Sequence, residues 1–304
     1  MKISVVIINY NTFELTSNCI KSVLENTKDI WTRDFMPFCL DYEIILVDNA
    51  STERNPDDFL ISFPNLRLIR SGFNGGFAYG NNLGLEIATG DLILLLNSDT
   101  FLFENSIARS ADYYGKLHNA GVLGCKMTYQ NGKVQFTARK FRSLSWELLD
   151  FFRVVPYLLP YSTRCRLMLG RYFRHDENIA ADWLNGAFFM FDRNLLNILP
   201  GKKLDDRFFM YGEDQLWCFQ ISKAGYNNHF YAGTSIIHIN SGSTKIENQL
   251  KLRKTMLRNE LEIMKLRKGG SLYFYIFSLI FIFVESVRNL IKKIAYLISG
   301  KAIR

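Results

Sequence analysis

The sequence lacks the cysteine pattern of a disulfide-stabilised or zinc-binding protein. Its five cysteines are scattered and odd in number, and no Cys-x-x-Cys occurs. This excludes a disulfide framework and a structural zinc site, and it favours a reducing compartment. The chain enters a strand-like run at Ile3–Ile8 without a charged segment and a cleavage site before it, so we expect no secretory leader. We therefore do not expect secretion.

Two familiar phosphate-binding patterns are absent as well. No Gly-Lys-Ser/Thr marks a Walker loop, and no Gly-x-Gly-x-x-Gly follows the first strand-like run.

The net charge of +8 is unevenly distributed. Residues 251–304 hold 12 Lys or Arg against 3 Asp or Glu, and the first 250 residues have a net charge of −1. A nucleic-acid-binding domain usually carries its positive charge on the folded body. A basic tail that is also apolar favours an anionic membrane surface, and we expect no nucleic-acid partner.

The 304 residues, 48% of them hydrophobic, are enough for one large α/β domain with appendages. Strand-like and helix-like segments alternate over the first 125 residues, which predicts a mostly parallel sheet with helices on both faces. The predicted strands are Ile3–Ile8, Glu43–Val47, Leu66–Arg70, Leu92–Leu96 and Gly121–Cys125, and the predicted helices are Glu14–Asn26, Ala78–Ala88 and Asn105–His118. Thr12 is the expected cap of the first helix.

The second half of the chain changes character. Basic residues are interleaved with aromatic ones over 140–175, which fits either an ordinary helical insertion or a face that binds lipid or acceptor. The further predicted elements are a strand in 182–191, a helix Gln215–Ala224 ended by Gly225, strands His229–Tyr231 and Ser235–Ile239, and a helix Glu247–Arg267. We expect one domain over 1–245 and a separate helical, membrane-associating region over 246–304.

The C-terminal tail is strongly apolar. Leu272 to Val284 has 12 apolar or aromatic residues in 13, and apolar residues continue at helical spacing to Ile298 with Arg288, Lys292 and Lys293 opposite. The apolar run is short for crossing a bilayer. We therefore favour an amphipathic helix in the plane of the membrane, on the cytoplasmic face, over a spanning or re-entrant one. A helix buried against the core is the third alternative.

The most informative stretch is the buried strand Leu92–Leu96 followed by Asn97-Ser98-Asp99. Ligands of α/β sheets bind beyond the carboxyl ends of such strands. A carboxylate at Asp99 suits a hard divalent cation that would hold phosphate oxygens. The alternative is a polar turn in which Asn97 and Asp99 only bond the local backbone.

Three further clusters could carry chemistry. Asn9-Tyr10-Asn11-Thr12 and Asp48-Asn49 end the first two strands, and Asp48 could bond a nucleoside or only form a turn. Asn74-Gly75-Gly76 lets backbone approach a ligand closely before a helix. Glu213-Asp214 lies at the start of a predicted helix. These acids could only stabilise the first turn of that helix, or one of them could act as a general base. His238 ends a late strand and is either structural or a metal ligand.

These clusters, in this order, resemble the inverting glycosyltransferases of family 2 with the GT-A fold, and most closely the rhamnosyltransferase-like branch. The matching stretches span about residues 1–245: Ser4–Asn11, Val47–Ser51, Asn74–Asn82, Asn97–Asp99, Asp182–Ala187 and Phe209–Asp214. Each motif is weak singly, and the ordered set is specific. Asn97 stands where the family pattern has a first carboxylate, and Gln215 stands where many relatives have another acid.

The resemblance implies transfer of a sugar, such as a rhamnose-like deoxysugar, from a nucleoside-diphosphate sugar to a lipid-linked or saccharide acceptor in surface polysaccharide synthesis. Mg²⁺ or Mn²⁺ would be held by Asp99, with His238 as a further ligand. Asp214 would be the base, beside Glu213. The implied nucleotide-binding residues are Asn9, Asn11, Thr12, Asp48, Asn49, Asn74, Gly75, Gly76 and Asn82, and the implied donor and acceptor pocket contains Asn97, Trp183, Asn185 and Gly186.

Two other functions compete with this interpretation. A non-catalytic nucleotide-sugar-binding or scaffold protein could use the same fold, although the presence of both Asp99 and Asp214 argues against it. A nucleotidyltransferase would need a Gly-rich loop with Arg and Lys directly after the first strand, and Asn9–Thr12 does not supply one.

Overall fold

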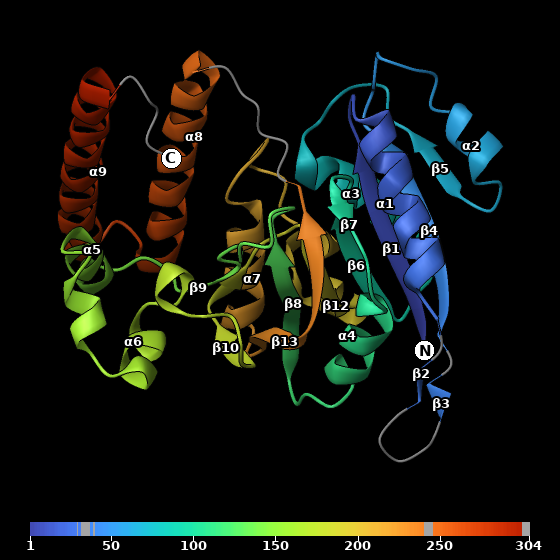
Figure 1. Ribbon diagram of the computed structural model, residues 1–304, viewed down its shortest axis with the longest axis horizontal. Helices are drawn as coiled ribbons and strands as arrows, with labels where there is room; N and C mark the ends of the chain where they lie inside the picture. The colour runs from blue at the N-terminus through green and yellow to red at the C-terminus, as the bar shows by residue number, and fades with distance from the viewer. Residues whose placement is uncertain (29, 32–36, 39, 240–245, 300–304) are drawn as a thin grey trace.

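The computed structural model describes residues 1–28, 30–31, 37–38, 40–239 and 246–299. Its centre is a twisted mixed sheet with the strand order β10-β13-β8-β12-β6-β1-β4-β5, and β7 pairs with β13 (Figure 1). The strands are β1 Lys2–Asn9, β4 Asp41–Asp48, β5 Arg67–Arg70, β6 Leu92–Asn97, β7 Thr100–Phe101, β8 Ala120–Thr128, β10 Ile179–Ala181, β12 Phe188–Asp192 and β13 Asn227–His238. Two short strand pairs lie outside this sheet: β2 Ile30–Trp31 with β3 Pro37–Phe38, and β9 Ala138–Arg139 with β11 Trp183–Leu184.

The alternation of side chains along the strands builds two cores. Val5 faces one side of β1 and Val6 the other, and both are fully buried, as expected for a strand covered on both faces. Helices α1 Phe13–Asn26, α2 Asp58–Ser62 and α4 Ser106–Tyr114 pack on the first face. Helices α3 Phe77–Ile87, α6 Tyr161–Leu167 and α7 Glu213–Lys223 pack on the second. This confirms the predicted α/β class with helices on both faces.

The N-terminal half of the sheet is parallel, and the C-terminal half is mixed. β1 pairs in parallel with β4 and β6, while β12 enters antiparallel between β6 and β8. The parallel register sets Asn9 beside Asp48 and Ile8 beside Asn97. The polar residues that follow β1, β4 and β6 therefore share one edge of the sheet, as their sequence positions predicted.

The basic-aromatic insertion and the tail form a helical layer at one end of the molecule. The insertion holds α5 Leu144–Phe151, α6 and the short 3₁₀ segments Val155–Leu158 and Gly170–Tyr172. The tail forms two long helices, α8 Ile246–Lys268 and α9 Leu272–Ser299, which lie side by side at the left of Figure 1. Between β12 and α7 the chain forms 3₁₀ segments at Arg193–Ile198 and Pro200–Lys202.

Three local predictions are wrong. The two short strands expected over 229–239 are one strand, β13, whose register against β8 slips between Tyr231 and Ser235. Thr12 precedes α1 but does not cap it, because its hydroxyl donates to Asn9 Oδ1 instead. Arg288 does not lie on a solvated polar face but in an ion-pair cluster with Asp150 and Glu285. The expected domain boundary at 245 falls on residues 240–245, which lie outside the described part of the chain, and stays a prediction.

Candidate functional site

The ends of β1 and β4 are joined through the side chain of Asn9. Its Nδ2 donates to Asp48 Oδ1 at 2.7 Å and to Ser51 Oγ at 2.9 Å, and its Oδ1 accepts from the hydroxyls of Thr12 and Thr16. The second carboxylate oxygen of Asp48 accepts the Ser51 N–H at 3.0 Å. Asp48 therefore forms the turn that its sequence context allowed, and it is almost completely buried while doing so.

The two loops that follow β1 and β4 are hydrogen-bonded to each other. Asn11 has a φ of 52°, in the left-handed region that asparagine tolerates. Its Oδ1 accepts the Thr52 N–H at 2.7 Å, and its own N–H donates to Ser51 Oγ at 3.0 Å. Backbone and side chains of both loops thus form one rigid rim at this edge of the sheet.

Asn49 connects this rim to the glycine-containing loop. Its Nδ2 donates to Asn74 Oδ1 at 2.9 Å and to the Gly76 carbonyl at 3.2 Å, and its Oδ1 accepts the Gly75 N–H. Gly76 has a φ of 89°, and a Cβ there would lie 2.2 Å from the carbonyl oxygen of Phe209. Only glycine fits, so the loop can press directly against the segment that leads into α7.

Asn82 lies apart from this group. It is buried in α3, where its Nδ2 donates to the Leu204 carbonyl at 2.9 Å and its Oδ1 accepts the Leu204 N–H at 3.0 Å. The amide of Asn82 therefore holds the chain that precedes α7. It acts on the site through that segment, because its polar atoms do not reach the rim of the cleft.

The end of β6 brings Asp99 next to His238. Asp99 Oδ1 and His238 Nε2 are 3.3 Å apart, and the Ile239 N–H donates to the Asp99 carbonyl at 2.9 Å. The other ring nitrogen, Nδ1, lies 2.9 Å from Gln135 Oε1, while Gln135 Nε2 donates to the His238 carbonyl at 2.6 Å. Gln135 Oε1 accepts from the Nδ1 side of the ring, so Nε2 is the ring nitrogen that faces Asp99.

This arrangement suits a small hard cation. The Asp99 oxygen and the His238 nitrogen, 3.3 Å apart, are close enough that both could bind one divalent cation. Asn97 Oδ1 is buried without a hydrogen-bond partner in the described part of the chain, so a neutral oxygen is also at hand. Within the described residues no third His, Cys, Asp or Glu joins the pair. A bound cation would complete its coordination with waters or phosphate oxygens.

The first turn of α7 holds Asp214 in a fixed orientation. Gly212 begins this turn with a φ of 96°, which favours glycine. Asp214 Oδ2 accepts the Gly186 N–H at 3.0 Å, and Oδ1 accepts the Gln215 N–H at 2.8 Å. Burial raises the pKa of Asp214 above its ordinary value, although these two N–H groups and the positive charge of Arg139 oppose the shift. A carboxylate of this kind is a stronger base than an exposed one.

Glu213 differs from its neighbour in role and environment. It is buried, and its Oε2 has no hydrogen-bond partner among the described residues. Burial and the charge of Asp214 together raise the pKa of Glu213. Asp214 has two N–H donors for a charged carboxylate, whereas Glu213 Oε2 has no partner among the described residues, so a negative charge is better stabilised on Asp214.

The stretch Trp183–Gly186 packs against α7 and is held in place by hydrogen bonds to backbone groups. The Trp183 ring N–H donates to the Lys140 carbonyl at 3.2 Å, and Asn185 Oδ1 accepts the Ala187 N–H at 2.9 Å. Gly186 packs so closely on Asp214 and Phe77 that a Cβ would lie 3.3 Å from Asp214 Cβ. The polar groups predicted to contact donor or acceptor thus fix the loop that orients the base.

The clusters are linked into a continuous edge. The hydroxyls of Thr12 and Ser98 lie 3.3 Å apart, which joins the β1 loop to the Asp99 turn. The Phe77 N–H donates to the Phe209 carbonyl at 3.1 Å, which joins the glycine loop to the start of α7. These bonds connect the β1 loop to the Asp99 turn and the glycine loop to the segment before α7, while Asn82 lies apart.

Comparison with known proteins decides the family. The model of "Glycosyl transferase family 2" matches residues 4–176, more than half of the chain. The chain belongs to this family. It is a glycosyltransferase, and the resemblance drawn from its motifs is confirmed.

Curated relatives of this family-2 glycosyltransferase are distant. An N-acetylglucosaminyl-diphospho-decaprenol L-rhamnosyltransferase of Mycobacterium tuberculosis is 26% identical over 219 residues, which cover 66% of this chain and 67% of the relative. A poly(ribitol-phosphate) beta-glucosyltransferase of Bacillus spizizenii is 34% identical over 137 residues, which cover 44% of this chain and 20% of the relative.

Solved structures confirm the GT-A fold. The mannosyltransferase PcManGT from Pyrobaculum calidifontis, in complex with GDP-Man and Mn²⁺, aligns with a TM-score of 0.56 at 16% identity, covering 93% of this chain and 68% of that one. S. aureus TarS 1-349 aligns with a TM-score of 0.51 at 15% identity, covering 92% and 79%.

Two residues of this glycosyltransferase site escaped the sequence analysis. Gln135 and Arg139 come from the segment that leads into β9, which carries no recognisable motif. Gln135 orients His238, and Arg139 places its guanidinium carbon 5.1 Å from the centre of the Trp183 ring while its charge acts on Asp214. An arginine just before a basic-aromatic stretch was the only available signal.

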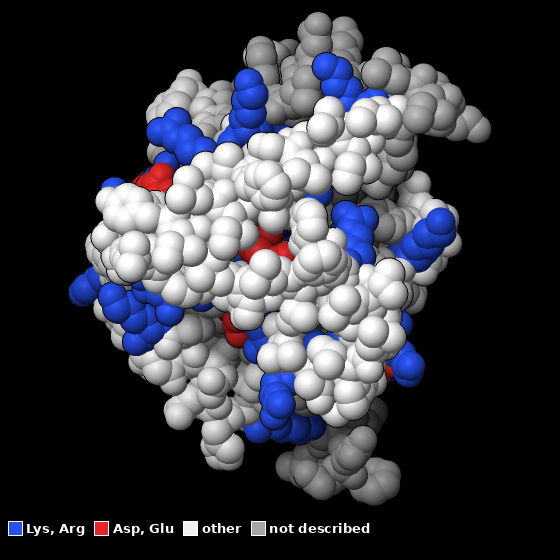
Figure 2. All heavy atoms as spheres, turned by 90° about the vertical axis from the view of Figure 1, so that its left-hand side faces the viewer, with Lys and Arg blue, Asp and Glu red and all other residues white. Residues whose placement is uncertain are grey.

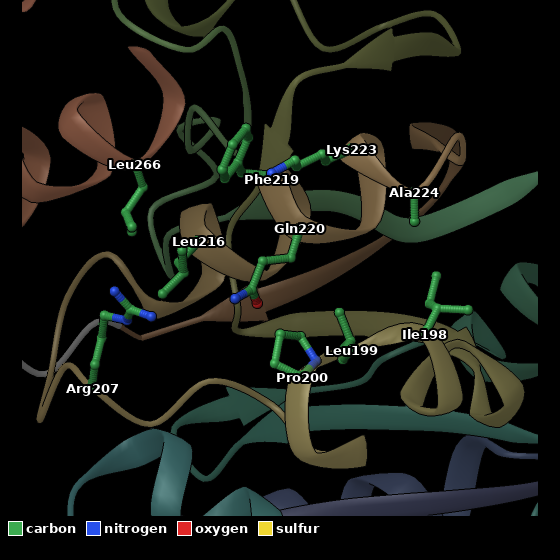
Figure 3. Close-up of a pocket in the computed structure, with 10 residues that line it drawn as sticks. All are labelled: Ile198, Leu199, Pro200, Arg207, Leu216, Phe219, Gln220, Lys223, Ala224 and Leu266. Atoms are coloured by element: carbon green, nitrogen blue, oxygen red, sulfur yellow. The ribbon is translucent and has the colours of Figure 1, made fainter. Parts of the chain in front are cut away.

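The cavity drawn in Figure 3 is a different place. It has a volume of about 360 Å³ and lies along the outer side of α7, with Arg207 and Leu266 at its margin. Leu216, Phe219 and Gln220 of α7 point into it, and none of the predicted site residues lines it. This cavity therefore lies apart from the predicted site residues.

Proposed function

We propose that this enzyme transfers a sugar, with inversion, from a nucleoside-diphosphate sugar to a hydroxyl of a lipid-linked or saccharide acceptor in cell-envelope polysaccharide synthesis. The names of its relatives support this assignment, because they include a rhamnosyltransferase acting on a diphospho-decaprenol carrier and a teichoic-acid-type glucosyltransferase. A rhamnose-like deoxysugar is our choice of donor sugar. We place the enzyme at the cytoplasmic face of the cell membrane.

The observation that carries the proposal is the held carboxylate of Asp214. Two backbone N–H groups fix its plane, and burial raises its pKa above the ordinary value, which makes it a stronger base than an exposed aspartate. The acceptor hydroxyl gives this proton to Asp214 as its oxygen bonds to the anomeric carbon. The bond from that carbon to the diphosphate breaks at the same time, and its electron pair leaves with the nucleoside diphosphate. Attack opposite the leaving group inverts the anomeric configuration.

The rim around Asn9, Asp48 and Asn49 would receive the nucleoside. Asp48 and Asn49 are buried and already bond the protein, so they shape the binding loops as well as offering their remaining lone pairs. Asn11, Thr12, Asn74, Gly75 and Gly76 would line the same pocket, and Asn82 would support it through Leu204.

Mg²⁺ or Mn²⁺ would be held by Asp99 and His238, with Asn97 Oδ1 near the same turn. A bound cation would offset negative charge on the diphosphate as the leaving group departs. The contribution of the protein is to keep the carboxylate and the imidazole side by side, through the Asp99 carbonyl and the Gln135 amide.

A panel of nucleoside-diphosphate sugars tests the proposal. Release of nucleoside diphosphate by the full chain should identify the donor, and NMR of the glycoside should show inversion. Asp214→Asn should lower kcat by about 10²–10⁴-fold with donor binding retained, because only the base is lost. Asp112→Asn, at an aspartate of α4 that pairs with Lys116, is the matched control and should leave kcat unchanged.

Two outcomes would contradict the proposal. Transfer that survives Asp214→Ala would remove this residue as the base. Donor binding without turnover of any sugar, equal in the parent chain and in Asp214→Asn, would favour the alternative of a nucleotide-sugar-binding scaffold.

A further inference from the structure

Helix α9 has two apolar faces, and only one of them is covered. Phe277, Phe281 and Val284 are buried, and the first two pack with Met264 of α8 and with the start of α5. The opposite side exposes large apolar side chains over most of the helix length, among them Leu272 at 74%, Leu279 at 72% and Phe283 at 64%. A soluble helix normally places polar residues on its outer side.

The apolar surface continues onto the insertion. Phe152, Val154 and Leu158, around the end of α5 and the 3₁₀ segment after it, are 58%, 73% and 79% exposed. α5 is fastened to α9, because the Leu144 N–H donates to the Tyr273 hydroxyl at 3.0 Å and Arg288 pairs with Asp150. We name the outer side of α9 together with residues 151–158 the outer apolar face.

Every acidic residue of these elements is turned inward. Glu147, Asp150 and Glu285 are the only acids in 140–175 and 270–299, and all three are buried. Glu147 pairs with Arg142 at 2.6 Å, and Glu285 pairs with Arg253 and Arg288, each at 2.7 Å. The outer apolar face is therefore free of exposed negative charge in the described part of these segments.

Basic side chains surround this face. Figure 2 views this end of the molecule and shows a broad, mostly uncharged area with Lys and Arg around its margin and a small group of acidic atoms near its centre. The exposed basic residues of the insertion, the end of α8 and α9 are Arg153, Arg166, Arg171, Arg174, Lys265, Lys268 and Lys293. Apolar side chains bounded by cations are complementary to a bilayer with anionic headgroups.

The packing of α8 against α9 also determines how α9 can be oriented in such a bilayer. Leu272–Ile291 is apolar and long enough to cross a membrane. However, α8 lies along α9 and exposes Lys254, Arg258 and Lys265, so a spanning α9 would bring these charges into the hydrocarbon. An α9 that lies in the interface keeps them in water.

We propose that the outer apolar face binds the surface of an anionic bilayer, with α9 and residues 151–158 inserted together and the ion-paired acids behind them. The site is thus composite and belongs to the folded enzyme, not to a detachable tail. Its purpose rests on the proposed function, since a lipid-linked acceptor would be met at that surface.

Vesicle flotation of the full chain tests this. Binding should be strong with vesicles of about 30 mol% phosphatidylglycerol in phosphatidylcholine and weak with phosphatidylcholine alone. Binding to the anionic vesicles should weaken in high salt. Leu279→Ser with Phe283→Ser should lower the partition coefficient by about tenfold or more, and so should Phe152→Ser with Leu158→Ser. Ile61→Ser is the matched control, because Ile61 is 82% exposed on α2 at the opposite end of the molecule.

Vesicle binding unaffected by Phe152→Ser with Leu158→Ser would overturn the composite face. An equal loss of vesicle binding in Ile61→Ser would overturn it as well. So would a protein that sediments as a stable dimer and does not float with vesicles. Donor hydrolysis without vesicles should be unchanged in all these variants. Binding without hydrolysis in the parent chain would count against the proposed function and leave the membrane face standing.

Discussion

At the scale of single residues, the site depends on partners that lie far apart in the sequence. Asp99 and His238 could be predicted as a pair because each ends a strand with a metal-binding side chain. Gln135 could not, because it is 103 residues from His238 and follows no motif. Its role arises only when β13 runs beside β8 and sets the glutamine against the imidazole.

Replacing Gln135 with Leu should weaken cation binding. The substitution removes the acceptor that makes Nδ1 donate, so the imidazole loses its fixed tautomer and orientation. We expect Mn²⁺ affinity, followed by electron paramagnetic resonance on the full chain, to fall by about 10-fold or more. Asn131→Ala, on the same segment but exposed, is the control. Equal Mn²⁺ affinity in Gln135→Leu and the parent chain would refute the assigned role.

Replacing Arg139 with Gln should shift the pH dependence of transfer. Asp214 must be deprotonated to act, and the charge of Arg139 lowers the pKa of Asp214 against the raising effect of burial. Without that charge the pKa rises, so the acid limb of kcat moves to higher pH and activity is lost from the acid side. Initial rates from about pH 5 to 9 measure this. Arg139→Lys should keep the acid limb near its original position, and a limb that stays put in Arg139→Gln would contradict the argument.

At the scale of elements, regular segments were predicted well because their signals are local. The buried runs of β1, β4 and β6 and the helices α1, α3 and α4 follow from apolar patterning, whereas the short helix α2 was not predicted. β13 was split in two because Ala232-Gly233-Thr234 reads as a break, whereas the sheet absorbs these residues as an irregularity against β8. Thr12 failed as a cap because Asn9, a partner in the tertiary structure, takes its hydroxyl.

At the scale of the whole molecule, the tail is integrated in a way that composition could not indicate. Its basic and apolar residues predicted a membrane-associating appendage, yet Arg288 and Glu285 connect α9 to the insertion and to α8. The pattern of charges along α9 says nothing about partners 138 residues away, such as Asp150. The separate region predicted from 246 onward stays a prediction, and these contacts favour a tail that folds with the rest of the chain.

Arg288→Met should therefore destabilise the whole chain and not α9 alone. The substitution keeps the stem of the side chain but leaves Asp150 buried with only the Tyr172 hydroxyl, at 2.8 Å, as a donor. Breaking a buried ion pair costs about 3–5 kcal/mol, whereas Lys293→Met, on the exposed side of the same helix, should change stability by about 0.5 kcal/mol or less. Urea unfolding followed by tryptophan fluorescence compares the two, since Trp146 lies on α5 and Trp217 lies on the buried side of α7 in the second core. A cooperative transition at clearly lower urea in Arg288→Met is the expected result, and equal midpoints for the two variants would show that the tail is an independent appendage.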